Sequence, residues 1–135
     1  MVRKSEIKFL RLRAEKFLKN AKGLYEEGIY DLAAFNVEQC IQLLLKYKLF
    51  LKIGYYPRTH SLKRLLRELS EVNEKLRDKL LTFYERHIET ISNIENAYIM
   101  ARYMPGEYEK SEVEKMLKVA EKLKKLLLSE EQHES

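Results

Sequence analysis

Apolar side chains recur every three or four residues through most of this chain. The first run comprises Ile7, Leu10, Ala14, Phe17, Ala21 and Leu24. This spacing places the apolar residues on one face of an α-helix. It predicts a helix over residues 4–27 that ends at Gly28, because glycine enters the left-handed conformation of a helix end without strain.

The same periodicity predicts four more helices. They cover residues 30–52, a short segment around 62–69 capped by Thr59 or Ser61, a long segment over 72–104 with a kink or split near Thr82, and a last helix opening at Ser111. Breaks fall at Gly54-Tyr55-Tyr56-Pro57 and at Pro105-Gly106. The sequence thus predicts an all-α, up-and-down bundle of four or five helices, forming one domain over 1–128 with a frayed polar tail at 129–135.

The second predicted helix is apolar on nearly all sides. Its core side carries Tyr30, Ala33, Ala34, Val37, Ile41, Leu44 and Leu51. Its opposite side carries Phe35, Leu43, Leu49 and Phe50, with Gln39, Gln42 and Lys46 set among them. Such a helix is normally covered on both sides. We therefore expect a homodimer through this helix and part of the fourth, with Phe35, Gln42, Leu43, Leu49 and Phe50 at the interface.

Composition agrees with an all-α class and narrows the setting. The 135 residues include 22 Leu and only five Val, which favours helix over strand. A single thiol, Cys40, cannot form an internal disulfide, and no apolar run is long enough to span a membrane, so we expect a cytoplasmic protein. The abundant Lys and Glu are also typical of thermophile proteins.

Charge and motifs exclude several function classes. The net charge of +5 is spread along the chain, so it favours an anionic partner only weakly. The sequence has no glycine-rich phosphate loop, no paired cysteines for zinc and no nucleophile elbow. With three histidines in all, we expect neither a metal site nor a cofactor.

Three polar sets remain as candidate sites. Gln39, Gln42 and Lys46 form either a solvated stripe or a polar floor whose lysine meets a phosphate. Around the end of the fourth predicted helix lie Asn96, Tyr98, Arg102 and Tyr103. There, arginine and tyrosine suit phosphate binding and base stacking, or Arg102 simply complements the helix dipole. The third candidate is His60, after the proline break.

These residues, taken in order, resemble the HEPN domain family. The resemblance rests on the stretch AKGLYEEGIYDLAAF at residues 21–35, the Glu38-Gln39 step, Lys46, Thr59-His60-Ser61-Leu62 and Ala101-Arg102-Tyr103. It implies a helical bundle that dimerises and a role around nucleotides or RNA, beside a minimal nucleotidyltransferase in a toxin–antitoxin system. By resemblance, Gln39, Lys46, His60, Arg102 and Tyr103 line the ligand-facing cleft.

Many HEPN proteins are metal-independent ribonucleases that use an Arg-x(4–6)-His motif. In this chain no arginine has a histidine five to seven residues later. We therefore expect a nucleotide- or RNA-binding module in which Lys46 and Arg102 hold phosphate while Tyr98 or Tyr103 stacks. Two alternatives stay open: a ribonuclease that pairs His60 with Arg102, and a purely structural module that binds another protein.

Overall fold

The computed structural model describes residues 4–103 and 108–134, and within these ranges every regular element is a helix. The helices are α1 (Lys4–Glu26), α2 (Tyr30–Ile53), α3 (Leu62–Val72), α4 (Arg77–Arg86), α5 (Ile88–Tyr103) and α6 (Lys110–Glu134). The predicted all-α bundle is confirmed.

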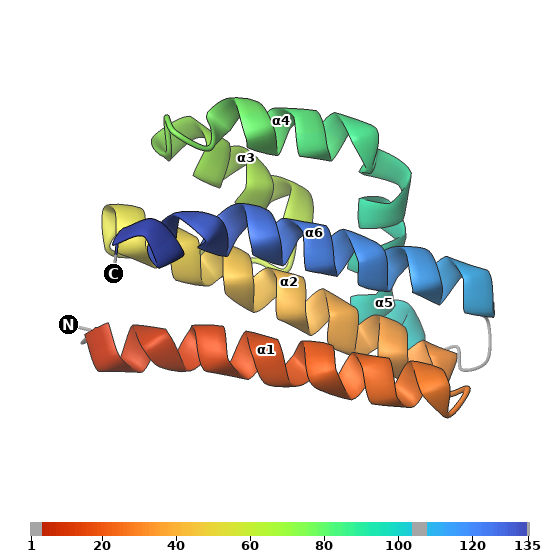
Figure 1. The fold of residues 1–135 in the computed structure, drawn as a ribbon. Helices are drawn as coiled ribbons and strands as arrows, with labels where there is room; N and C mark the ends of the chain where they lie inside the picture. The colour runs from red at the N-terminus through yellow and green to blue at the C-terminus, as the bar shows by residue number, and fades with distance from the viewer. Residues whose placement is uncertain (1–3, 104–107, 135) are drawn as a thin grey trace.

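Helix α2 occupies the centre of the bundle. It packs against α1, α3, α5 and α6. The three long helices α1, α2 and α6 lie side by side, and α3 and α4 lie on the side of α2 away from α1 (Figure 1). Its residues Ala33, Val37, Ile41 and Leu44 are almost completely buried. Since each of these lies three or four residues from the next, the predicted core side is confirmed for them. The prediction is wrong for Leu51 near the end of the helix, which is 48% exposed.

Both ends of α2 are bounded by glycines in the left-handed region. Gly28 precedes the helix with φ of 79° and Gly54 follows it with φ of 82°. The backbone N–H of Gly54 donates to the carbonyl oxygen of Phe50 at 2.8 Å. These are conformations that glycine adopts without the steric cost other residues incur, so the predicted stop at Gly28 is confirmed.

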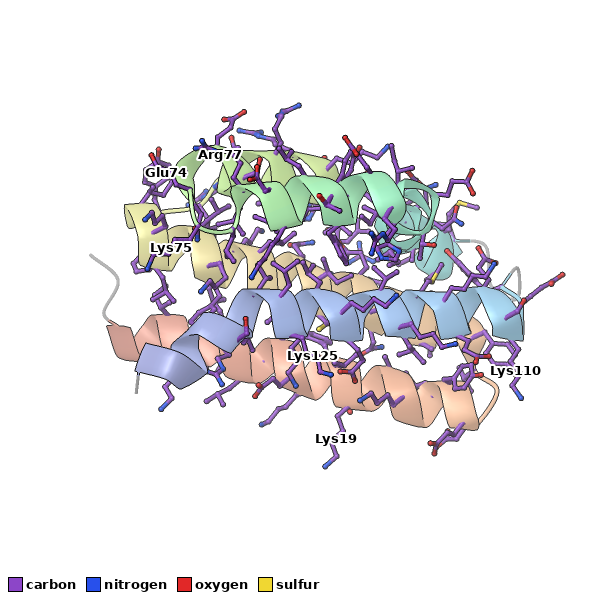
Figure 2. All side chains as sticks on the ribbon, turned by 45° about the horizontal axis from the view of Figure 1, so that its top comes forward. Lys19, Glu74, Lys75, Arg77, Lys110 and Lys125 are labelled. Atoms are coloured by element: carbon purple, nitrogen blue, oxygen red, sulfur yellow. The ribbon has the colours of Figure 1, made fainter. Side chains whose placement is uncertain are left out.

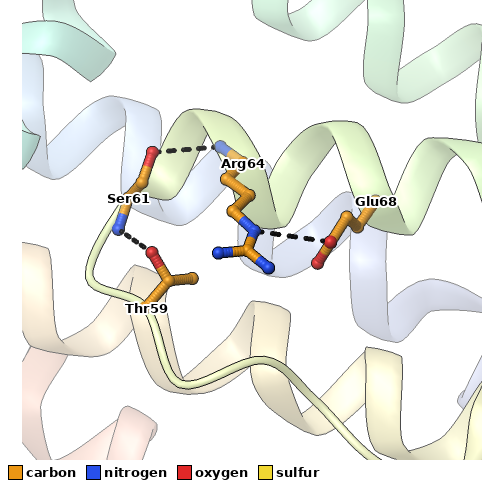
Figure 3. A network of polar contacts seen from close by, with 4 residues as sticks. All are labelled: Thr59, Ser61, Arg64 and Glu68. Atoms are coloured by element: carbon orange, nitrogen blue, oxygen red, sulfur yellow. Dashed lines mark hydrogen bonds and ion pairs between the residues drawn. The ribbon is translucent and has the colours of Figure 1, made fainter.

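Helix α3 begins with the predicted serine cap. The Ser61 hydroxyl oxygen accepts a hydrogen bond from the backbone N–H of Arg64 at 3.2 Å, and the Thr59 hydroxyl oxygen accepts one from the N–H of Ser61 at 3.1 Å (Figure 3). Arg64 in turn pairs with Glu68 one turn later, at 3.4 Å. The two hydroxyls therefore order the segment that leads His60 into the helix.

The segment predicted as one long helix over 72–104 begins later and is divided once. Val72 is the last residue of α3, and α4 begins at Arg77 after a turn in which the Asn73 side-chain oxygen accepts from the N–H of Leu76 at 3.2 Å. Arg77 then donates to the carbonyl oxygens of Ser70 and Glu71, both at 2.8 Å. These carbonyls belong to the last turn of α3, so the arginine closes that helix end instead of continuing it.

The predicted split of this segment is found at His87, five residues after Thr82, near which we expected it. His87 has φ of −120° and ψ of 22°, and its N–H still donates to the carbonyl oxygen of Phe83 at 3.0 Å. Its ring lies against the Phe83 ring, with centroids 4.9 Å apart. The predicted break at Pro105-Gly106 lies outside the described residues.

The last helix departs slightly from expectation at both ends. It begins at Lys110, so Ser111 lies inside the helix and is not its N-cap. It continues to Glu134, past the point at which we expected the polar tail to start. The added residues are mostly Glu, Gln and Ser, of which the first two are good helix formers.

The apolar second side of α2 has an explanation within the single chain. Leu49 is 0% exposed and Gln42 is 6% exposed, so neither is at the surface. Phe35, Leu43 and Phe50 are only partly buried. The inference that this side requires a second subunit is therefore corrected for Leu49 and Gln42, because other helices of the same chain already cover them.

Charged side chains surround the bundle. Lys19 on α1 and Lys110 and Lys125 on α6 project outward, as does Lys75 in the turn between α3 and α4 (Figure 2). This placement agrees with the diffuse positive charge expected from the sequence. None of the helices, within the part of the chain that the structure describes, combines the length and the apolar character needed to cross a membrane.

Candidate functional site

A chain of hydrogen-bonded polar side chains follows one stripe of α2. The Glu38 carboxylate accepts from the amide nitrogens of two glutamines, Gln39 at 2.7 Å and Gln42 at 2.8 Å. The Gln42 carbonyl oxygen then accepts from the ammonium group of Lys46 at 3.0 Å. The predicted set of Gln39, Gln42 and Lys46 is thus a connected network, organised by a carboxylate that the sequence analysis did not single out.

Glu38 is an acid placed inside the bundle. Its side chain is 0% exposed. Burial raises its pKa from 4.5 to about 7, although the hydrogen bonds from Gln42 and Gln39 and the charge of Lys46 oppose that rise. The nearby Glu95 carboxylate on α5 raises it slightly further. A buried polar group is costly unless it is hydrogen-bonded, and here both oxygens have partners.

Lys46 lies at the outer end of this network. Partial burial lowers the pKa of its ammonium group, while the Glu38 charge opposes the change. The ammonium nitrogen also lies 5.6 Å from the centre of the Tyr56 ring, in the loop that follows α2. The lysine is thus held between an amide oxygen and an aromatic face, as a half-buried cation with one end toward solvent.

Aromatic rings from three segments form a second group beside the network. Tyr98 of α5 stacks on His60, with ring centroids 4.0 Å apart and 22° between the planes. The Tyr98 hydroxyl and the His60 Nε2 atom are also hydrogen-bonded at 3.1 Å. Phe35 of α2 is a further neighbour of the tyrosine, with ring centroids 6.4 Å apart. His60 is exposed, whereas Tyr98 and Phe35 are half-buried.

Arg102 covers this aromatic group. Its guanidinium carbon lies 4.6 Å from the centre of the Tyr98 ring and 5.4 Å from that of Phe35. The spacing of four residues between Tyr98 and Arg102 on α5 brings them together. Contacts with two rings orient the Arg102 side chain. The residue also lies in the last turn of α5, where its charge complements the helix dipole.

The two groups form one continuous surface. On α2, Phe35, Gln39, Gln42 and Lys46 follow one another at spacings of four, three and four, which is one side of a helix. On α5, Glu95 interacts electrostatically with Glu38 and lies one turn before Tyr98. We call this the α2–α5 surface and define it by Phe35, Gln39, Lys46, His60, Tyr98 and Arg102.

The structure separates Tyr103 from the other candidates. Its side chain is 74% exposed, and no contact among the described residues ties it to the stacked rings. Phe35, predicted from the sequence for a dimer interface, also lies in the aromatic group. Glu38 and Tyr56 were missed, although a carboxylate in the middle of an apolar helix, followed by glutamines one and four residues later, is a readable signal for a buried network.

Cys40 lies outside this network and is completely buried. Burial raises the pKa of its thiol to about 12. A thiol that stays protonated at neutral pH is a poor nucleophile, so Cys40 acts as a small core residue. Among the described residues, no three His, Cys, Asp or Glu side chains gather into a possible metal site.

Comparison with known proteins places the chain in a family. The sequence model of the HEPN domain matches residues 7–131, nearly the whole chain. The chain belongs to the HEPN family. No curated protein matches the HEPN chain. Its fold is similar to the crystal structure of TT1696 from Thermus thermophilus, with a TM-score of 0.71 and 25% sequence identity over 91% of this chain and 96% of that one.

Membership of the HEPN family gives the α2–α5 surface a context. The family resemblance rested in part on Glu38, Gln39, Lys46, His60 and Arg102. In the fold these residues come from two helices and a loop: Glu38 is buried and bonded to Gln39, and the other four belong to the α2–α5 surface. What the surface offers chemically is two cations, stacked rings and oriented amides.

Proposed function

We propose that this HEPN chain binds RNA or nucleotides through the α2–α5 surface. The observation that supports the proposal most is the stack of His60, Tyr98 and Arg102, which combines exposed planar groups with a guanidinium. Single-stranded nucleic acids are recognised by base stacking on such groups and by cations that hold the phosphates.

The residues of the surface have different roles. The Tyr98 ring contacts the His60 ring and the Arg102 guanidinium group, so Tyr98 orients both groups. A base then stacks on the exposed His60 ring, and not directly on the tyrosine as the sequence suggested. Arg102 and Lys46 hold phosphate groups on either side, because each is positioned by aromatic faces and keeps its charge toward solvent.

Binding of a short single-stranded RNA at low salt tests the proposal. We expect Arg102→Ala to weaken binding about tenfold and to lower the dependence of affinity on salt by about one phosphate contact. Arg86→Ala, which removes an exposed arginine from α4, is the charge-matched control and should change affinity far less. Equal weakening by both variants, or no binding by the wild type, contradicts the proposal.

We further propose that the functional unit is a homodimer that works with a minimal nucleotidyltransferase in a toxin–antitoxin arrangement. The half-buried Phe35, Leu43 and Phe50 and the exposed Ile99 of α5 supply apolar area for a second copy. Sedimentation at micromolar concentration should give a dimer, and a monomer refutes the proposed dimer.

Co-expression with the neighbouring gene tests the proposed nucleotidyltransferase partner. A stable complex without nucleotide affinity would favour a purely structural module.

A metal-independent ribonuclease is the second candidate function. Its supporting observation is that Tyr98 contacts both His60 and Arg102. One ring thus holds a histidine that can act as general base and an arginine that can bind phosphate. We expect any cleavage of RNA in the presence of EDTA to be lost in His60→Ala. Absence of cleavage by the wild type, or cleavage that survives the substitution, excludes His60 as the catalytic group.

A further inference from the structure

We propose that Gln39 is a specificity-determining residue that reads the 6-amino group of adenine, with Glu38 as the residue that positions it. The inference rests on the proposed binding of RNA or nucleotides at the α2–α5 surface and names the base preferred there. It is drawn from the direction of the hydrogen bonds in the α2 network.

An ionised carboxylate only accepts hydrogen bonds. Both oxygens of Glu38 are occupied, one by the amide nitrogen of Gln39 at 2.7 Å and the other by that of Gln42 at 2.8 Å. Each glutamine must therefore turn its nitrogen toward Glu38 and its carbonyl oxygen away. The orientation of Gln42 agrees independently, because its oxygen accepts from the Lys46 ammonium group, which can only donate.

The carbonyl oxygen of Gln39 is left to face the ligand. None of the hydrogen bonds among the described residues uses it, and the side chain is half-buried, so the oxygen is neither satisfied by the protein nor freely rotating. Gln39 lies one turn after Phe35, which belongs to the aromatic group of Tyr98 and Arg102. An oriented acceptor thus lies on the side of α2 that carries Phe35, one turn from the aromatic group on which we place the base.

Adenine is the base that an oriented glutamine amide reads best. Its 6-amino group donates to a carbonyl oxygen, while the ring nitrogen beside it accepts from an amide N–H. The Gln39 amide nitrogen uses one hydrogen for Glu38 and keeps a second for such a pair. A stacked purine that lacks the 6-amino group leaves the oriented oxygen without a donor, which costs affinity.

The orientation depends on the charge of Glu38. The charged groups that face this carboxyl are Lys46 on the same helix and Glu95 on α5. When Glu38 takes up a proton, one of its oxygens becomes a donor and one glutamine must reverse its amide. We therefore expect the preference for adenine to be greater at about pH 8 than at about pH 6, on either side of the Glu38 pKa of about 7.

The test compares two RNA oligomers of equal length by fluorescence anisotropy. One is an oligoadenylate, and in the other each adenosine is replaced by purine riboside, which stacks similarly but has no 6-amino group. At about pH 8 we expect the wild type to bind the oligoadenylate about tenfold more tightly. Gln39→Met, which keeps the length of the side chain, should remove the preference between the two oligomers. Glu38→Gln should reduce the preference and abolish its dependence on pH.

The outcomes separate this inference from the proposed function. If the wild type binds both oligomers equally and Arg102→Ala weakens both, the surface binds RNA but Gln39 does not select adenine. A preference that persists in Gln39→Met also overturns the inference. Failure of the wild type to bind either oligomer overturns the proposed function itself. Circular dichroism melting of each variant shows whether it is folded in the assay.

Discussion

The residue with the most unusual environment is Glu38, and its proton has a consequence for stability. An acid whose pKa is higher in the folded chain than in the unfolded chain stabilises the folded state at low pH, because the native state then binds more protons. For Glu38 this contribution is fully present below pH 4.5 and is lost as the pH rises through about 7. The total change amounts to about 3 kcal/mol at most.

Glu38→Gln tests this linkage, since glutamine fills the same space without titrating. We expect the variant to become more stable relative to the wild type as the pH rises from about 5 to about 8, because only the wild type loses the contribution of Glu38. Lost hydrogen bonds add an offset that does not vary with pH. Urea denaturation at several pH values measures both. A difference that is constant over this range would contradict the raised pKa.

At the scale of the element, replacing two glycines by alanine should change stability in opposite directions, one glycine inside α1 and one just after its end. Gly23 lies inside the helix with open space where a Cβ would go, so Gly23→Ala should stabilise the chain by about 1 kcal/mol. Gly28 has φ of 79°, so Gly28→Ala should destabilise it by about 1 kcal/mol. Thermal denaturation of the two variants provides the comparison, and each serves as the control for the other.

The start of α3 offers a second test at this scale. Ser61→Ala removes the hydroxyl that accepts from the Arg64 N–H, and we expect a loss of about 1 kcal/mol in the free energy of unfolding. Ser129→Ala is the matched control, because this exposed serine lies inside α6 and caps no helix start, and it should change stability by less than about 0.5 kcal/mol. Similar losses at both positions would mean that the cap contributes nothing specific.

For the whole molecule, the central position of α2 makes its core side the main source of stability. Leu44 is 0% exposed in a helix that touches four others, whereas Leu51 on the same helix is 48% exposed. We expect Leu44→Ala to lower the free energy of unfolding by about 2 to 5 kcal/mol and Leu51→Ala to leave it nearly unchanged. Chemical denaturation distinguishes the two. A small effect at Leu44 would mean that the core closes around the cavity.

The elements with a strong local signal were predictable. Gly28, Gly54 and Ser61 end or begin helices by conformations and hydrogen bonds that depend only on nearby residues. The start of α4 at Arg77 instead of Val72 was not predictable, because it depends on the reach of Arg77 back to the end of α3. A contact over six or seven residues leaves no periodic mark in the sequence.

The candidate site shows the same division between local and distant causes. Gln39, Lys46, His60 and Arg102 were identified from residue type and spacing. The burial of Glu38 and the stacking of Phe35 on Tyr98 were not, since they depend on α5 lying against α2. Periodicity shows that a helix has two apolar sides, but it does not say whether a neighbour in the same chain or a second chain covers them.

By itself, the sequence determined that this protein is an all-α domain with an apolar stripe on each helix and a resemblance to HEPN proteins. Helical periodicity and capping are local properties, so they can be read along the chain. Only the tertiary structure decided which stripes face each other, and with them the burial that raises the Glu38 pKa and the position of Arg102 over two rings. Burial and stacking arise between segments that are distant in sequence, and their energies exist only once the helices have packed.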